Sequence, residues 1–194
     1  ARCFRDEDLR ANRQPEFTQI DLEMSFVEAE DVMDLNEKLV QYIFKTILDV
    51  DVKLPMERMP YRIAMEKYGS DKPDLRFGME IENISEVVAN SEFKVFRDAL
   101  DNGGSVRAIK AENCAGMGRK QIDKLTDFVK TFKAKGLAWI AYKEGEIKSP
   151  IAKFLSEDEM KAILNKMNAK VGDLILIVSD AKNKIVLQSL GQLR

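Results

Sequence analysis

The 194-residue chain carries 31 basic and 33 acidic residues, which gives a net charge of −2 at pH 7, and 45% of its residues are hydrophobic. This balance excludes binding to nucleic acid through bulk positive charge, so any RNA contact has to be local. The chain has no histidine, which removes the commonest general base and the commonest zinc ligand. The cysteines, Cys3 and Cys114, are too few for a disulfide framework or a zinc site, so we predict a reducing cytoplasm and no metal site. No apolar run approaches the ~18 residues that a membrane span needs.

The chain begins with alanine, is polar at once and reads like the middle of a strand. We therefore expect it to be a piece of a longer protein. A processed mature end is the alternative.

The first part of the chain predicts two strands followed by helices. Residues 1–8 and 16–26 are rich in β-forming side chains, and a basic, polar segment separates them, which indicates antiparallel strands joined by a long loop. Ser25 and Glu28 have the spacing of a capping box, and apolar residues at helical spacing then predict a helix over 30–49. A short helix over 61–68 should stop at Gly69, where a turn-rich joint begins.

After this joint the pattern changes to alternating strands and helices. We predict strands at 77–84, 106–111, 137–142, 147–149 and 174–179, and helices at 119–135 and 156–170, the second capped by Ser156. Residues 180–184 should form a turn, and 185–187 should lead into the last segment. Because a hairpin interrupts the alternation, we predict an α+β fold with a mainly antiparallel sheet and helices on one side of it.

The residues of the first strand suggest chemistry. Arg5 and Glu7 are two positions apart and should share one face of the strand, with Phe17 across from them. Such a face could hold a nucleotide, with Arg5 on a phosphate and Phe17 stacked on a base. A solvent-exposed cross-strand ion pair and a core phenylalanine are the alternatives.

Two strings in this region carry a resemblance. Residues 4–10 read Phe-Arg-Asp-Glu-Asp-Leu-Arg, and residues 13–21 read Arg-Gln-Pro-Glu-Phe-Thr-Gln-Ile-Asp. Together they resemble motif 2 of class II aminoacyl-tRNA synthetases, in the form found in bacterial aspartyl-tRNA synthetases. The resemblance implies a partial class II antiparallel core and a parent that uses ATP with Mg²⁺, aspartate and tRNA.

The resemblance also implies roles for individual residues. Arg5 matches the catalytic arginine that contacts the ATP α-phosphate and the aspartate carboxylate. The resemblance assigns ATP binding to Arg5 and also to Asp6, Glu7, Gln14 and Phe17. Phe17 matches the ring that stacks on adenine. Asp21 looks like an acid near the aspartate ammonium group. Arg10 and Arg13 match the loop that reaches the acceptor end of tRNA, although Asn12 stands where an aspartate is expected.

Residues 66–76, Glu-Lys-Tyr-Gly-Ser-Asp-Lys-Pro-Asp-Leu-Arg, resemble the segment that precedes the bacterial insertion domain. The resemblance implies two domains, a partial catalytic core over 1–75 and a GAD insertion domain over 76–194. The family's remaining parts, including its other active-site motifs, are not found in the chain. The chain alone should therefore be inactive, while its parent is implied to be a homodimeric ligase.

One alternative of another class stays open. A stand-alone, non-catalytic GAD-type module could bind tRNA or a synthetase partner through the basic loop and the lysine-rich helix over 119–135. In front of that helix, the glycines of residues 115–118 could contact a phosphate or form only a helix-entry turn. The sequence does not distinguish a parent that charges only aspartate tRNA from one that also charges asparagine tRNA.

Overall fold

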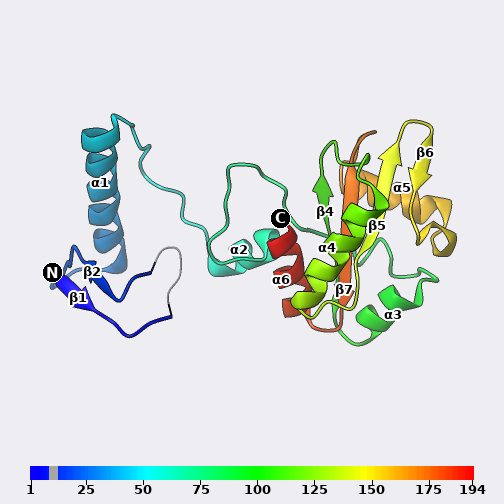
Figure 1. The fold of residues 1–194 in the computed structure, drawn as a ribbon, viewed down its shortest axis with the longest axis horizontal. Helices are drawn as coiled ribbons and strands as arrows, with labels where there is room; N and C mark the ends of the chain where they lie inside the picture. Colours follow the sequence, from blue (N-terminus) through cyan, green and yellow to red (C-terminus); the bar gives the residue numbers. More distant parts are fainter. Residues whose placement is uncertain (9–12) are drawn as a thin grey trace. The chain divides into compact units, whose positions relative to one another are not determined.

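The computed structural model describes residues 1–8 and 13–194. It divides into two compact units, residues 1–58 and 59–194 (Figure 1). The predicted division at 75/76 concerns the domains of the family, and it stays a prediction. No helix of the described residues is long and apolar enough to cross a bilayer.

The first unit contains a short hairpin and one long helix. Strand β1 (Arg2–Phe4) pairs antiparallel with β2 (Glu16–Thr18), and α1 (Ala29–Leu48) follows. Both strands are shorter than predicted. The cap of α1 also differs from the prediction, because the N-cap is Glu28, whose backbone N–H donates to Asp31 Oδ2 at 2.9 Å. The predicted partner Ser25 lies three residues upstream of that cap.

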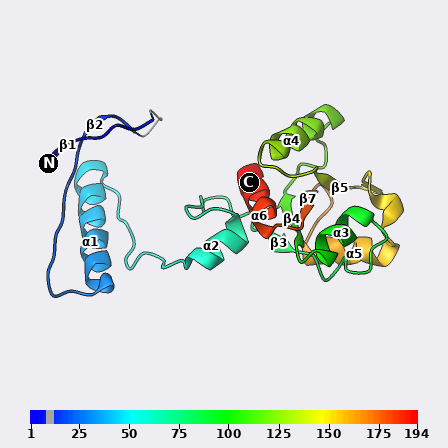
Figure 2. The same ribbon diagram turned by 90° about the horizontal axis from the view of Figure 1, so that it is seen from below.

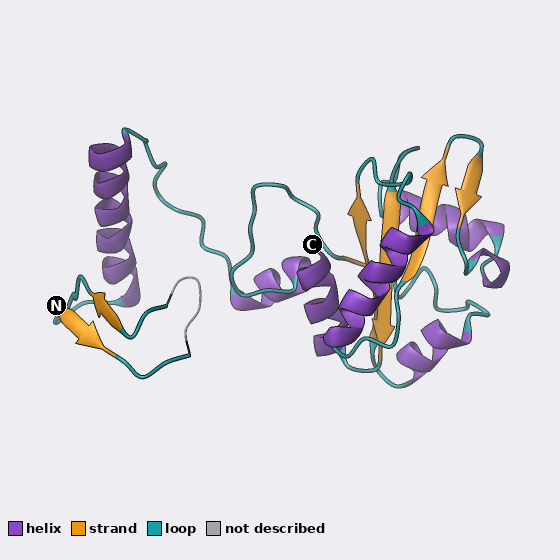
Figure 3. Cartoon of the chain, viewed as in Figure 1, coloured by secondary structure: helices purple, strands orange, loops and turns teal. Residues whose placement is uncertain are grey.

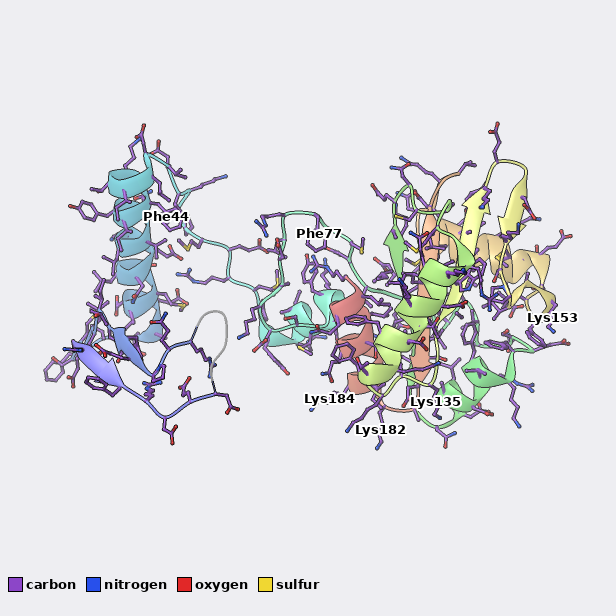
Figure 4. The ribbon with its side chains drawn as sticks, viewed as in Figure 1. Phe44, Phe77, Lys135, Lys153, Lys182 and Lys184 are labelled. Carbon is purple, nitrogen blue, oxygen red and sulfur yellow. The ribbon has the colours of Figure 1, made fainter. Side chains whose placement is uncertain are left out.

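Among the described residues of the first unit, the apolar side chains of α1 are not covered by a buried apolar core. Glu37 is the only buried residue among the described residues of this unit, and it forms an ion pair with Arg58. Phe44, labelled in Figure 4, is 41% exposed and Ile47 is 73% exposed. Apolar stripes of this size on a helix normally face a partner surface.

The second unit is built on an antiparallel sheet with the order β3-β4-β7-β5-β6 (Figure 3). Its strands are β3 (Glu82–Asn83), β4 (Ser105–Ala111), β5 (Ala138–Lys143), β6 (Glu146–Lys148) and β7 (Leu174–Asp180). Its helices are α2 (Tyr61–Tyr68), α3 (Lys94–Asp101), α4 (Arg119–Thr131), the short 3₁₀ turn η1 (Ala152–Phe154), α5 (Glu157–Lys166) and α6 (Asn183–Leu193). The α+β class and the antiparallel pairing were predicted correctly.

The prediction of helices on one side of the sheet was wrong. Figure 2 shows α4 on one side of the sheet and α3 and α5 on the other. The central strand β7 explains why, because its side chains alternate between two buried clusters: Ile175 and Ile177 join one, while Leu174, Leu176 and Val178 join the other. A strand covered on both faces reads as a continuous apolar run, and Leu-Ile-Leu-Ile-Val is such a run.

Three further elements differ from the predictions. The predicted strand over 77–84 is reduced to β3, because Gly78 and Met79 both have positive φ. Helix α3 was not predicted, and neither was α6, which begins inside the turn predicted over 180–184 and includes residues 185–187. By contrast, α2 ends at Gly69 as predicted, and Ser156 caps α5 by accepting the N–H of Glu159 at 3.1 Å.

Arg194, at the end of α6, binds the segment that follows α2. Its guanidinium carbon lies over two rings, 4.7 Å from the centroid of Tyr68 and 4.4 Å from that of Phe77, which is labelled in Figure 4. Its Nε donates to the carbonyls of Gly78 and Met79, each at 3.1 Å. Cation–π contacts and satisfied donors together hold this loop in place.

Next to this contact, Glu80 accepts hydrogen bonds from Lys67 Nζ at 3.2 Å and from Tyr68 Oη at 3.0 Å. The ammonium of Lys67 lowers the pKa of Glu80 below its ordinary value of 4.5. The same pair raises the pKa of Lys67 above 10.5. A carboxyl group with a lowered pKa stabilises the fold above its ordinary pKa, and this contribution is lost as the pH falls.

We therefore expect Glu80→Gln to lose less stability than the wild type when the pH is lowered from 6 to 3.5. The amide keeps a partner for Tyr68 but removes the charge that is protonated in this range. The midpoint of urea unfolding, followed by Trp139 fluorescence, measures the effect. Glu86→Gln, at an exposed acid that forms no ion pair with a described residue, is the control and should follow the wild type. Equal acid sensitivity of wild type and Glu80→Gln would contradict this assignment.

Candidate functional site

The hairpin of the first unit places five of the predicted site residues around one cavity. Cys3 is opposite Phe17 in the β1–β2 register, and the pairing continues beyond β1 because the N–H of Arg5 donates to Pro15 O at 2.8 Å. Side chains alternate along a strand, so Arg5 and Glu7 follow Cys3 on the face that also carries Phe17. The cavity has a volume of about 320 Å³ and is lined by Arg5, Glu7, Arg13, Gln14 and Phe17.

The cavity combines a cationic wall with an aromatic one. The guanidinium carbon of Arg5 lies 5.5 Å from the centroid of the Phe17 ring. Glu7 connects the two arginines, because its Oε2 is 3.1 Å from Arg13 Nη1 and its Oε1 is 3.9 Å from Arg5 Nη1. The predicted face shared by Arg5, Glu7 and Phe17 is therefore confirmed in its geometry.

The arginines keep donors available for a ligand. The Arg5 side chain is 60% exposed and the Arg13 side chain is 49% exposed. Each guanidinium has five N–H donors in a planar fork that suits phosphate and carboxylate oxygens. Phe17 is half-buried and offers a ring face beside them. The arrangement can therefore hold an anionic group next to a flat aromatic one.

The other predicted residues lie elsewhere. Asp6 and Asp21 are exposed and do not line this cavity. Arg10 and Asn12 lie outside the described residues. Arg13, predicted for the tRNA acceptor end, lies at the cavity itself. The alternation of the strand could have indicated this, because the register brings residues 13–17 back beside residues 3–7.

A magnesium ion has little to bind here on its own. Glu7 is the single carboxylate among the described residues of the cavity lining, and it already pairs with Arg13. Mg²⁺ in nucleotide sites is commonly held through substrate phosphates with one or two carboxylates. The residues present therefore fit the phosphates and base of a nucleotide better than a bare metal ion.

Comparison with known proteins agrees with the sequence motifs. The model of the tRNA synthetases class II (D, K and N) matches residues 1–182, which cover the cavity and most of the second unit. The chain belongs to this family.

Individual relatives are close in sequence. The chain is 78% identical over 193 residues to the aspartate–tRNA ligase of Clostridium tetani and, at the same identity, to that of Clostridium botulinum strain Kyoto. The ligase of Clostridium botulinum strain Hall is 76% identical. The alignments include all of this chain but only 33%, 32% and 32% of these relatives, so the chain spans about a third of their length.

Proposed function

We propose that the chain is part of an aspartate–tRNA ligase, which activates aspartate with ATP and transfers it to tRNA in the cytoplasm. One observation carries the proposal. In a chain that is 78% identical to aspartate–tRNA ligases, Arg5, Glu7, Gln14 and Phe17 meet at a single cavity. These residues match the ATP-binding motif of class II synthetases.

The reaction determines what this cavity has to do. A carboxylate oxygen of aspartate forms a bond to the α-phosphorus of ATP, the bond from that phosphorus to the bridging oxygen breaks, and pyrophosphate leaves with the electron pair. Negative charge accumulates on the α-phosphate in the transition state. Arg5 supplies fixed positive charge for it, and Phe17 holds the adenine so that the reacting atoms stay aligned.

The remaining roles follow from the same proposal. Gln14 and Glu7 orient the nucleotide, and Mg²⁺ would be held through the phosphates of ATP. Asp6 and Asp21 are assigned to ATP and to the aspartate ammonium by the motif match alone. The motif match alone assigns Arg10 and Arg13 to the acceptor end of tRNA, and Arg13 also lines the cavity, where it could contact both substrates.

The exposed face of α1 supports a larger parent. A helix with Phe44 and Ile47 exposed needs a covering surface, and the relatives are about three times longer than the chain. We propose that other segments of the ligase cover this face, that the parent is a homodimer, and that residues 76–194 form its GAD insertion domain. A stand-alone module is not favoured, because the family match begins at residue 1 and includes the cavity.

A chimera tests the function. The corresponding third of the Clostridium tetani ligase is replaced by these 194 residues, and aspartate-dependent ATP–pyrophosphate exchange and tRNA charging are measured. We expect both rates to stay within tenfold of the unmodified ligase, while the 194-residue chain alone shows no exchange. A folded, dimeric chimera without exchange would contradict the proposal.

A further inference from the structure

A second concave site lies in the second unit, between the β5–β6 hairpin and the beginning of α4. It has a volume of about 460 Å³. Three segments line it: the loop before α4 with the first turn of that helix, strand β5, and the end of β6. Its lining includes Met117, Arg119, Ile122, Trp139, Lys143 and Lys148.

The strand register places the side chains of this cleft on one face of the sheet. Lys148 is opposite Ala141, while Trp139 and Lys143 flank Ala141 at two residues on either side along β5. Lys148 is therefore a diagonal neighbour of both Trp139 and Lys143, at roughly 7–8 Å. The small side chain of Ala141 leaves the space between them open.

The two lysines are available to an anion. No carboxylate of the described residues lies within 4.0 Å of Lys143 or Lys148, whereas Arg119 already pairs with Asp123 at 2.9 Å. Glu146 is opposite Lys143 in the ladder, and Glu144 lies in the adjoining turn. These two acids reduce the positive potential of the cleft, which comes from the two lysines. Two ammonium groups at this spacing can both donate to one phosphate, with N···O distances of about 2.8 Å.

Trp139 gives the cleft an aromatic wall. Its indole packs against the buried cluster under α4 and stays half-exposed at the cleft. Aromatic side chains next to cationic ones are the usual platform for unpaired bases, because every base has a face that can stack. In a duplex these faces are covered by the neighbouring base pairs, so the platform discriminates in favour of single strands.

We propose that this cleft binds a nucleotide of single-stranded RNA, with the base against Trp139 and the phosphate between Lys143 and Lys148. The inference rests on the proposed function, since ligation to tRNA is what brings RNA to this protein. The cleft shares no lining residue with the cavity at Arg5 and Phe17, which is lined by residues of the first unit. It would give the second unit an RNA contact of its own.

Trp139 is the single tryptophan of the chain, so its fluorescence reports on this cleft alone. We would titrate the 194-residue chain with a 12-nucleotide single-stranded RNA and, separately, with a duplex of the same length. We expect saturable quenching by the single strand and at least tenfold weaker binding of the duplex. Binding should weaken with salt at a log–log slope of about −0.7 for each phosphate contact.

Paired variants locate the contact. Lys143→Gln with Lys148→Gln should weaken binding at least tenfold and reduce the salt slope by about 0.7, because the two lysines share one phosphate. Lys161→Gln with Lys166→Gln, on α5 on the opposite face of the sheet, removes the same charge and should change the affinity less than twofold. Glu146→Gln should tighten binding a few-fold, because it removes the acid opposite Lys143.

The possible results separate this inference from the function. The proposal is supported if quenching is lost in the Lys143/Lys148 variant and kept in the α5 variant. No quenching, equal quenching by duplex, or quenching unchanged in the Lys143/Lys148 variant overturns it. Because the chimera assay measures exchange and charging, its failure alongside normal quenching would overturn the function and not the cleft.

Discussion

Arg5→Ala in the chimeric ligase should lower kcat/KM for aspartate-dependent pyrophosphate exchange by about 10²–10³-fold, the loss typical of removing one donor to a developing negative charge. The guanidinium lines the cavity beside Phe17, and its side chain is 60% exposed, so its removal leaves no cavity in a packed core. The loss should therefore appear in the rate and not in folding.

Two further variants make this prediction specific. Arg5→Lys should recover only part of the activity, because an ammonium keeps the charge but not the planar fork. Arg2→Ala is the matched control, since Arg2 lies in β1 three residues before Arg5, has a side chain that is 70% exposed, and pairs with Glu16 outside the cavity. The exchange rate of this Arg2→Ala variant should stay within threefold of that of the unsubstituted chimera. An Arg5→Ala chimera with undiminished exchange would remove Arg5 from the reaction.

Gly69→Ala should destabilise the second unit by roughly 2–4 kcal/mol, through overpacking and backbone strain together. A Cβ at this position would lie 2.0 Å from Leu187 O and 2.9 Å from Gly191 Cα, and both are backbone atoms of α6. Its φ of +66° adds strain for any residue with a side chain. Since backbone of a packed helix cannot move aside easily, α2 and α6 would have to separate.

Gly78 provides a control with the same backbone conformation. Its φ is +65°, but a Cβ there would meet nothing within 4 Å. Gly78→Ala should therefore show only the strain of the positive φ, about 1 kcal/mol. Urea unfolding followed by Trp139 fluorescence measures both variants. If they were equally destabilised, close contact between α2 and α6 would not be what requires glycine at position 69.

The sequence predicted elements whose signals are local. Helix α2 ends where Gly69 supplies a left-handed residue, and α5 begins where Ser156 and Glu159 form their reciprocal cap. The helix over 30–49 was predicted almost to its ends, even though the cap lies at Glu28 and not at Ser25. Such signals act within about four residues, so a single sequence contains them in full.

Helices α3 and α6 show where local signals fail. Residues 183–193 contain Ile185, Val186 and Gly191, which do not favour a helix. The segment is helical because Val186 and Leu190 are buried against the sheet and α4. Coverage of both sheet faces likewise depends on where β7 lies, and only the long-range pairing of β4 and β5 with it decides that.

For the candidate site too, some features follow from local sequence and others follow only from the tertiary structure. The sequence determined the family and predicted that Arg5, Glu7, Gln14 and Phe17 belong to one site, because the motif is contiguous and strand alternation places Arg5 and Glu7 on one face. Only the tertiary structure decided that Arg194 binds residues 74–79, and that Trp139, Lys143 and Lys148 line one cleft. These groupings depend on register and on chain segments up to 120 residues apart, where sequence spacing carries no information about distance.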